Sequence, residues 1–254
     1  MSLKCGRSFQ RPIYRDLDGL LRKRFSVSVE EIQAVLFDLD GTLVDARDRL
    51  LLSCRQALHQ LELGELDETA YWEAFQSYNV GKLVPVSMQE QFFALLLHGY
   101  STYTGHVRLI PGAIEALRFC REQGYGTAVI TGRPTSSAHV RAELERVGLA
   151  PFIDVIKTQE GMVIPAVLTK DHRLLEAIEE LRTVPERSLY VGDLPDDISS
   201  ARRAGLRLSV AVLSGGIHRD LLALREPDVI LNSVGELPEY LIASHRATET
   251  TENI

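Results

Sequence analysis

The residues Ala34-Val35-Leu36-Phe37-Asp38-Leu39-Asp40-Gly41-Thr42 decide how this chain is interpreted. A short apolar run, 34–37, ends directly in two carboxylates separated by one residue, and a glycine follows them. An apolar run of this length, bounded by a turn signal, is typical of a buried strand. The stretch therefore predicts a strand that delivers Asp38 and Asp40 to the loop at its carboxyl end.

The two carboxylates can serve one site, because side chains at positions i and i+2 of an extended backbone lie on the same face. Like charges this close repel each other unless a cation compensates them. Hard oxygen ligands of this kind suit Mg²⁺. Gly41 permits a turn that brings backbone amides near an anion. The pattern thus predicts a magnesium site beside an anion-binding loop.

Similar short runs rich in β-branched residues recur downstream and alternate with helical patterns. We expect strands at 126–130, 152–156, 188–191, 208–212 and 228–230. One helical pattern runs from Pro111 to Cys120, with Gly124 as its stop. This alternation predicts an α/β fold, with a Rossmann-like, mostly parallel sheet flanked by helices and ligands gathered at the carboxyl ends of the strands.

Residues 46–107 interrupt the alternation, because they offer helical patterns at 49–63, 68–77 and 89–100 without a convincing buried strand. Since this insert follows the first strand, we expect it to lie over that strand's carboxyl end as a small all-helical cap. The predicted domains are an N-terminal basic arm at 1–30, a core at 31–45 and 108–245, the cap at 46–107, and a C-terminal tail at 246–254.

Bulk composition narrows the class of protein. With 45% hydrophobic and 25% charged residues the chain has an ordinary globular composition, and its net charge of -7 disfavours a protein that coats nucleic acid. Three scattered cysteines without a CxxC pair favour a reducing compartment, and no apolar run reaches the length of a membrane span. We therefore expect a cytoplasmic protein without nucleic-acid or membrane partners, of unknown oligomeric state.

The stretch from Phe37 to Asp45 resembles the first signature of the haloacid dehalogenase (HAD) superfamily of phosphatases, and three further signatures follow in order. Thr131 closes a core strand, Lys170 opens a later helix, and the sequence Gly-Asp-Leu-Pro-Asp-Asp at 192–197 follows another strand. The position and length of the insert match the helical cap of the phosphoglycolate phosphatase-like branch. The resemblance covers the predicted core but not the basic arm.

The resemblance implies a catalytic role for four residues. Asp38 would attack phosphorus and form an aspartyl phosphate, and Asp40 would protonate the leaving oxygen and then activate water. Contact with the metal would keep Asp38 ionised, while Asp40 can hold a proton. Thr131 would hydrogen-bond a phosphoryl oxygen, and Lys170 would offset the charge around it.

The same resemblance implies a metal site and its support. The expected Mg²⁺ ligands are Asp38, the backbone carbonyl of Asp40, and Asp193. Asp197 is expected to support the metal waters or Lys170. The remaining supporting residues are the small and polar neighbours of the signatures, namely Gly41, Thr42 and Gly132.

Three basic residues leave alternatives open. Lys157 is a rival to Lys170, because many relatives place proline after the active-site lysine and this chain has Asp171. Arg133 follows Thr131 closely and is either a substrate contact or an exposed salt-bridging residue. Lys82 lies in the insert, where a cap loop could present it to the leaving group.

The implied function is Mg²⁺-dependent hydrolysis of a small phosphorylated metabolite, and the chain would be a phosphoric monoester hydrolase. A phosphomutase of the same fold, or a catalytically silent protein that binds phosphate ligands, remains an alternative. A dehalogenase is disfavoured because its nucleophile loop normally lacks the second carboxylate, here Asp40. The substrate itself is not predicted, since cap residues follow no general code.

Overall fold

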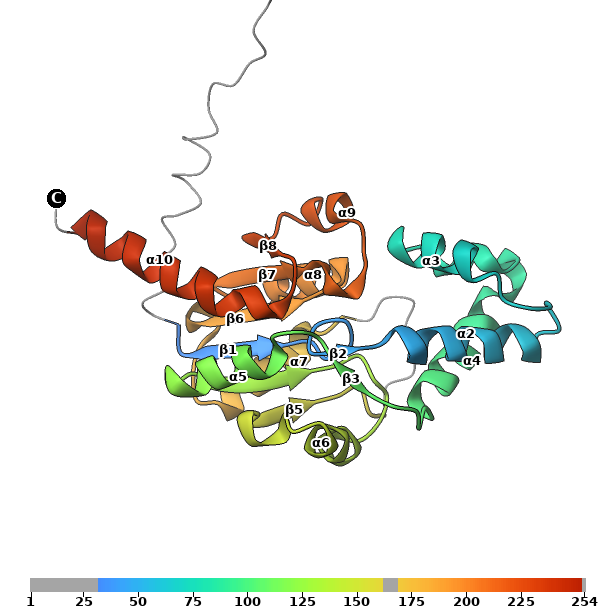
Figure 1. Cartoon of the computed structure of the whole chain (residues 1–254), viewed down its shortest axis with the longest axis horizontal. Coiled ribbons are helices and arrows are strands. Elements are labelled where there is room, and N and C mark those ends of the chain that lie inside the picture. The colour runs from blue at the N-terminus through green and yellow to red at the C-terminus, as the bar shows by residue number, and fades with distance from the viewer. Residues whose placement is uncertain (1–31, 162–168, 253–254) are drawn as a thin grey trace, which may run out of the picture.

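The computed structural model describes residues 32–161 and 169–252, and the predicted basic arm lies outside the described residues. A six-stranded sheet forms the centre, with the strand order β5-β4-β1-β6-β7-β8 (Figure 1). Every pairing in this sheet is parallel. The strands are β1 (Ala34–Phe37), β4 (Gly126–Ile130), β5 (Val155–Lys157), β6 (Ser188–Gly192), β7 (Leu208–Val212) and β8 (Val229–Leu231).

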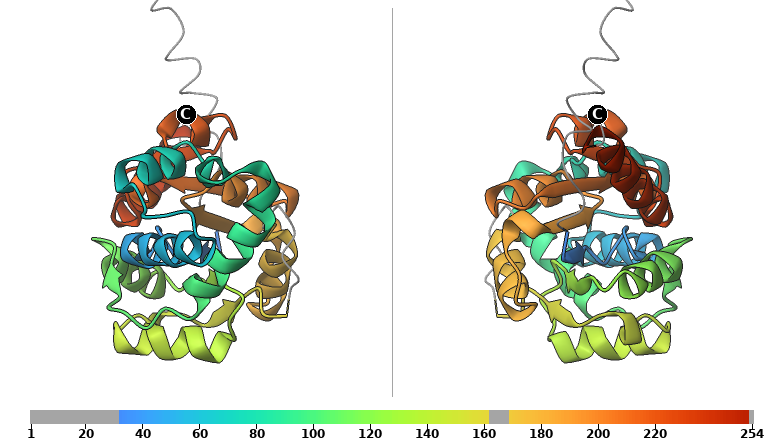
Figure 2. Two further views of the ribbon diagram at one scale, coloured as in Figure 1. Left: turned by 90° about the vertical axis from the view of Figure 1, so that its right-hand side faces the viewer. Right: turned by 90° about the vertical axis from the view of Figure 1, so that its left-hand side faces the viewer.

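Helices cover both faces of the sheet (Figure 2). Alternate side chains of β1 explain this, because Val35 and Phe37 belong to one apolar cluster while Ala34 and Leu36 belong to another. The first cluster includes residues of α5 (Ala113–Glu122), α6 (Ser137–Arg146) and α10 (Leu237–Glu252). The second includes residues of α7 (Asp171–Glu180) and α8 (Pro195–Arg203). The predicted α/β fold with a flanked parallel sheet is confirmed.

Several boundaries differ from the predictions; for example, β6 ends one residue later than expected, and β8 lies one residue later. The strand expected at 152–156 begins only at Val155, because η3 (Ala150–Phe152) precedes it. Pro151 stands in the first turn of η3, where its fixed φ and missing N–H are tolerated. Towards the other end of the described residues, α10 continues to Glu252, and the tail limits at 246–254 stay a prediction.

A helical insert lies between the two short strands β2 (Val44–Asp45) and β3 (Arg108–Leu109), which pair antiparallel. It contains α2 (Arg47–Gln60), α3 (Glu68–Gln76), η1 (Val80–Leu83), η2 (Val86–Met88) and α4 (Gln89–Ser101). The insert has an apolar cluster of its own, centred on Cys54, Leu58, Tyr71 and Phe92. The predicted domain limits, including the cap at 46–107, stay predictions.

The insert contacts the core beyond the carboxyl ends of the strands. Phe75 of α3 packs against a cluster that includes Ile198 and Leu222. The backbone N–H of His218 donates to the Gln76 carbonyl at 3.0 Å. The remaining bounded elements are η4 (Pro185–Arg187), η5 (Leu213–Gly215), α9 (Arg219–Ala223) and η6 (Val234–Glu236). Within the described ranges, no helix has the length and apolarity that crossing a membrane requires.

Candidate active site

The register of the three central strands brings the first, second and fourth signatures together. Phe37 of β1 pairs with Val129 of β4 on one side and with Val191 of β6 on the other. Parallel strands in this register end at the same edge of the sheet. Asp38, Thr131 and Asp193, which follow these strands, are all buried at that edge. The sheet therefore assembles side chains that are distant in the sequence.

Three carboxylates converge at this edge. Oxygens of Asp38, Asp193 and Asp197 all lie within 4.8 Å of one another, and all three residues are buried. Asp197 sits in the first turn of α8, where its Oδ2 accepts the Leu194 N–H at 3.0 Å. The Thr42 hydroxyl donates to Asp193 Oδ1 at 3.4 Å. The structure thus adds the Asp197 carboxylate to the predicted pair of Asp38 and Asp193.

Two glycines make room for Asp193. A Cβ on Gly41 would lie 2.5 Å from Asp193 Oδ2, and Gly41 has φ of 86°, a left-handed conformation that suits glycine. A Cβ on Gly215 would also collide with the Asp193 carboxylate. The Gly41 carbonyl accepts a hydrogen bond of 2.6 Å from the Ser214 hydroxyl. The glycine loop therefore permits the close approach of the carboxylate from β6.

Lys170 lies inside the acidic cluster. Its ammonium donates to Asp38 Oδ1 at 2.5 Å and to Asp197 Oδ1 at 2.7 Å. Burial opposes the charged form, but the nearby carboxylates of Asp197 and Asp38 raise the pKa of Lys170 well above its usual value. Lys157 instead pairs with Glu180 at 2.8 Å, with both side chains partly exposed. The geometry therefore favours Lys170 over Lys157 as the active-site lysine.

Neighbours that sequence reasoning missed hold Lys170 in place. The Tyr190 hydroxyl of β6 lies 3.3 Å from the Lys170 ammonium and donates to Asp197 Oδ1 at 3.1 Å. The Lys170 backbone N–H donates to Ser200 Oγ at 3.0 Å, and Gln159 Nε2 donates to the preceding carbonyl of Thr169 at 3.1 Å. These contacts anchor the lysine even though Asp171 follows it where many relatives have proline.

The charges of the cluster fit a divalent cation. Burial raises the pKa of Asp38 to about 7, with repulsion from Asp197 and Asp40 adding to this and Lys170 opposing it. Burial and the charge of Asp38 likewise raise the pKa of Asp193 well above its usual value. When ionised, the three carboxylates carry more negative charge than the single positive charge of Lys170 can balance. Since their donors are hard oxygens, the arrangement fits Mg²⁺.

Asp40 is turned towards Arg133 rather than into the acidic cluster. Arg133 Nε donates to Asp40 Oδ2 and Arg133 Nη2 donates to Asp40 Oδ1, each at 2.6 Å. Burial would raise the pKa of Asp40, but Arg133, with Arg49 and Tyr100, outweighs it and lowers that pKa. These pKa shifts come from the protein groups alone, whereas the expected split, in which Asp38 is ionised and Asp40 holds a proton, requires contact with a metal. The split therefore stays a prediction.

Arg133 is buried. The sequence left two alternatives for it, a substrate contact or an exposed salt-bridging residue, and neither included a buried ion pair. Its Nη1 donates to Glu143 Oε1 of α6 at 2.8 Å, and Arg49 Nη2 of α2 donates to Glu143 Oε2 at 2.7 Å. It is thus a salt-bridging arginine, but a buried one. Glu143 and Arg49 were missed because a helical pattern alone does not reveal which polar side chains turn towards a site.

The remaining candidates occupy different positions. Thr131 is buried at the sheet edge, and its Oγ1 accepts the Arg133 backbone N–H at 3.3 Å across Gly132. Lys82 is exposed on η1. Within the described parts of the chain, no hydrogen bond or ion pair joins Lys82 to the acidic cluster.

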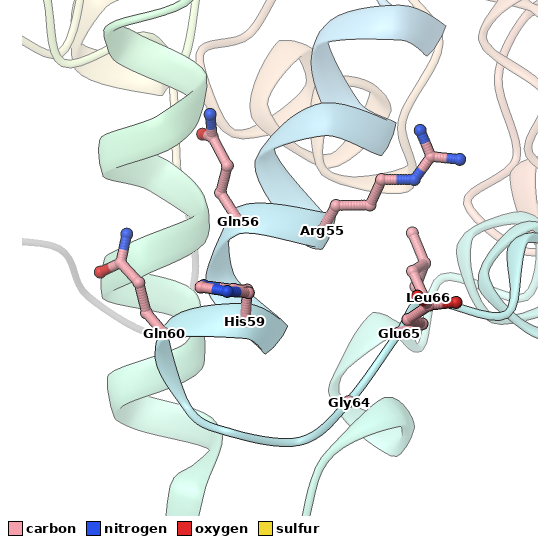
Figure 3. Close-up of a pocket in the computed structure, with 7 residues that line it drawn as sticks. All are labelled: Arg55, Gln56, His59, Gln60, Gly64, Glu65 and Leu66. Carbon is pink, nitrogen blue, oxygen red and sulfur yellow. The ribbon is translucent and has the colours of Figure 1, made fainter.

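A hollow of about 560 Å³ lies on the insert (Figure 3). It is lined by residues of α2 and the following turn, namely Arg55, Gln56, His59, Gln60, Gly64, Glu65 and Leu66. None of these residues was predicted to act in the site. The hollow shares no lining residue with the acidic cluster.

Comparison with known proteins agrees with this fold. Residues 35–211 match the family described as haloacid dehalogenase-like hydrolase. A phosphoglycolate phosphatase of Salmonella typhi is 28% identical over 253 residues, covering 89% of this chain and 98% of the relative. Among solved structures, a predicted phosphoglycolate phosphatase from Haemophilus somnus has a TM-score of 0.64 at 22% identity, covering 83% of this chain and 98% of its own.

A predicted phosphatase from Clostridium acetobutylicum has a TM-score of 0.66 at 23% identity, covering 84% of this chain and 99% of its own. Fold and site define an enzyme whose polar side chains gather at the carboxyl edge of a parallel sheet. The chain belongs to the haloacid dehalogenase-like hydrolases, since the family model spans most of its length. The family predicted from the four signatures is confirmed.

Proposed function

We propose that this chain is a phosphoric monoester hydrolase that cleaves a small phosphorylated metabolite with the help of Mg²⁺. The single observation that carries the proposal is the convergence of Asp38, Asp193 and Asp197 around the Lys170 ammonium at one buried sheet edge. The phosphoglycolate phosphatase of Salmonella typhi, which resembles the chain over nearly its whole length, supports it. Phosphoglycolate is accordingly the first substrate to test.

Asp38 is the proposed nucleophile. One of its oxygens forms a bond to phosphorus while the bond from phosphorus to the leaving oxygen breaks, and the electron pair of that bond stays on the leaving oxygen. The leaving oxygen takes a proton from Asp40, which must first acquire it and free one oxygen from Arg133. Lys170 offsets the negative charge that gathers on the phosphoryl oxygens.

Water completes the reaction. Asp40, now ionised again, takes a proton from a water molecule as the water oxygen bonds to phosphorus. The bond from phosphorus to Asp38 then breaks, and its electron pair restores the carboxylate. Arg133 lowers the pKa of Asp40, so this carboxylate is ionised when the water arrives.

The metal-binding role falls to Asp38, Asp193 and the Asp40 carbonyl, with Asp197 beside them. When bound there, Mg²⁺ would neutralise negative charge on the phosphoryl group and on Asp38. The hydroxyl of Thr131 would donate to a phosphoryl oxygen. The cytoplasmic location stays a prediction.

The test is phosphate release from a panel of monoesters, including phosphoglycolate, sugar phosphates and p-nitrophenyl phosphate, with and without Mg²⁺. We expect magnesium-dependent turnover that Asp38→Asn reduces by at least about a thousandfold. The matched control is Asp220→Asn, since Asp220 is an exposed aspartate of α9. Folded wild-type protein that releases no phosphate from any ester would favour a protein that only binds phosphate ligands.

A further inference from the structure

A chain of buried charges connects the helical insert to Asp40. It runs from Arg49 of α2 to Glu143 of α6, on to Arg133 after β4, and from there to Asp40. The exposed fractions of Arg49, Glu143 and Arg133 are 5%, 2% and 3%. These three buried charges and the partly buried Asp40 depend on one another, because loss of one leaves its neighbour without a partner.

Arg133 fixes the direction of the Asp40 carboxylate. Two nitrogens of the guanidinium, Nε and Nη2, each donate to a different Asp40 oxygen at 2.6 Å. A fork of two parallel hydrogen bonds defines the plane of the carboxylate as well as its distance. The orientation of Asp40 is therefore set by the Arg133 side chain, together with the hydrogen bond from the Tyr100 hydroxyl.

Glu143 fixes Arg133 in turn. It accepts from the third guanidinium nitrogen, Nη1, at 2.8 Å, and its other oxygen accepts from Arg49 Nη2 at 2.7 Å. Among the described residues, no hydrogen bond or ion pair joins Glu143 to the acidic cluster. It therefore acts on the site only through the two arginines.

Arg49 links the helical insert to this chain of charges. Its guanidinium carbon lies 5.3 Å from the ring centre of Tyr100 on α4 and 5.0 Å from that of Tyr103. Its Nη1 is 3.8 Å from Asp40 Oδ1, beyond hydrogen-bond distance. The position of Arg49 is thus set by α2, which carries it, and by α4, which carries Tyr100. Its guanidinium pairs with Glu143 and lies near Asp40.

We propose that Glu143 and Arg49 are positioning residues that set, through Arg133, the direction in which Asp40 meets the leaving oxygen. The alignment of the acid and base group then depends on a docked helical insert. This inference rests on the role given to Asp40 in the proposed function. It adds two residues that do not touch the reacting atoms.

The proposal has a specific kinetic consequence. As phosphorus bonds to Asp38, the breaking bond leaves its electron pair on the leaving oxygen, which takes the proton held on one Asp40 oxygen while Arg133 keeps the other. A basic alkoxide needs that proton, whereas p-nitrophenolate leaves readily without it. Misalignment of Asp40 should therefore slow alkyl phosphates more than p-nitrophenyl phosphate.

The experiment compares kcat/KM for an alkyl phosphate, such as glycerol phosphate, and for p-nitrophenyl phosphate in wild type and Glu143→Gln. This parameter covers the steps up to departure of the leaving group. We expect the alkyl-to-aryl ratio to fall about tenfold, a part of what a positioned acid contributes. Glu145→Gln, an exposed glutamate on the same helix, is the matched control and should keep the wild-type ratio.

Arg49→Lys provides an independent variant, because it keeps the charge but loses the planar fork. Arg49→Lys should also lower the alkyl-to-aryl ratio of kcat/KM. If Glu143→Gln does not fold, this variant tests the proposal in its place. Equal losses on both substrates in a folded variant would mean that the chain of charges is merely structural, and they would overturn this inference alone. Wild-type protein that hydrolyses neither ester would overturn the proposed function together with the inference.

Discussion

Asp38 and Asp40 are separated by one residue but have different neighbours. Asp38 faces two further carboxylates and the Lys170 ammonium, so burial and repulsion raise its pKa to about 7. Asp40 faces the guanidinium of Arg133, and its pKa is lowered. The two carboxylates therefore have different surroundings, and the roles proposed for them differ too: Asp38 binds a cation and attacks phosphorus, and Asp40 exchanges protons.

Replacing Lys170 tests the centre of the acidic cluster. Lys170→Met should lower kcat at least about a hundredfold and lower the free energy of unfolding by about 3 kcal/mol, because it leaves buried carboxylates without their cation. Lys157→Met is the matched control, since Lys157 pairs with Glu180 near the surface. It should change stability by less than about 0.5 kcal/mol. The measurements are steady-state kinetics and urea denaturation.

The reverse ranking, with Lys157→Met inactive and Lys170→Met active, would assign the active-site lysine to the other candidate. Unfolding curves of both variants in the same buffer separate loss of the site from loss of the fold.

The site residues that could be predicted are those that follow strands. Asp38, Thr131 and Asp193 each come directly after an apolar run, and parallel strands deliver such residues to one edge. Glu143 and Arg49 could not be found this way, because they lie on helices whose rotation depends on packing between elements. Their ion pair joins residues that are far apart in the chain.

At the scale of elements, α3 joins the insert to the core beside the fourth signature. Phe75 packs against core residues, and the Tyr78 hydroxyl donates to Asp196 Oδ2 at 2.7 Å. Asp196 stands between Asp193 and Asp197. The docking of α3 is therefore close to the acidic cluster, and substrate that binds between insert and core would favour the docked arrangement.

Removing this hydrogen bond should weaken substrate binding. Tyr78→Phe takes away about 1 kcal/mol from the docked insert, so KM should rise about fivefold while kcat changes little. Tyr240→Phe on α10, which packs on the main apolar cluster of the core, is the control. An unchanged KM in Tyr78→Phe, measured by steady-state kinetics, would show that this contact does not limit docking.

The elements with a clear pattern were predictable. The strands β4 and β7 have the predicted bounds, because a buried parallel strand is a continuous apolar run between turn signals. β2 and β3 contain two residues each, too few for any period to appear. Their pairing joins residues on either side of the whole insert, so it depends on contacts that no local pattern records.

At the scale of the whole molecule, the acidic cluster makes stability depend on pH and on cation binding. Because the pKa of Asp38 is raised from 3.8 to about 7, the folded protein binds more protons than the unfolded chain between these values. Its stability without Mg²⁺ should therefore fall as pH rises from about 4 to about 7, by up to about 1.4 kcal/mol per pH unit for a titrating carboxyl. Asp193 shifts in the same direction.

Mg²⁺ should offset this loss, because it binds the ionised carboxylates. Its stabilisation should be larger at pH 8 than at pH 5, reaching about 2.7 kcal/mol at a concentration one hundred times its Kd. Chemical denaturation at both pH values, with and without Mg²⁺, is the measurement. Asp193→Asn should abolish most of the response, and an equal response in that variant would place the cation elsewhere.

The central claim is that Asp38 carries the phosphoryl group, and trapping that intermediate tests it most directly. Asp40→Asn should slow its hydrolysis, so the variant is mixed with p-nitrophenyl phosphate and Mg²⁺, quenched in acid and reduced with sodium borohydride. Reduction converts an aspartyl phosphate to homoserine, which peptide mass spectrometry locates. We predict homoserine at position 38 alone; homoserine at another aspartate, or none while turnover continues, would contradict the account.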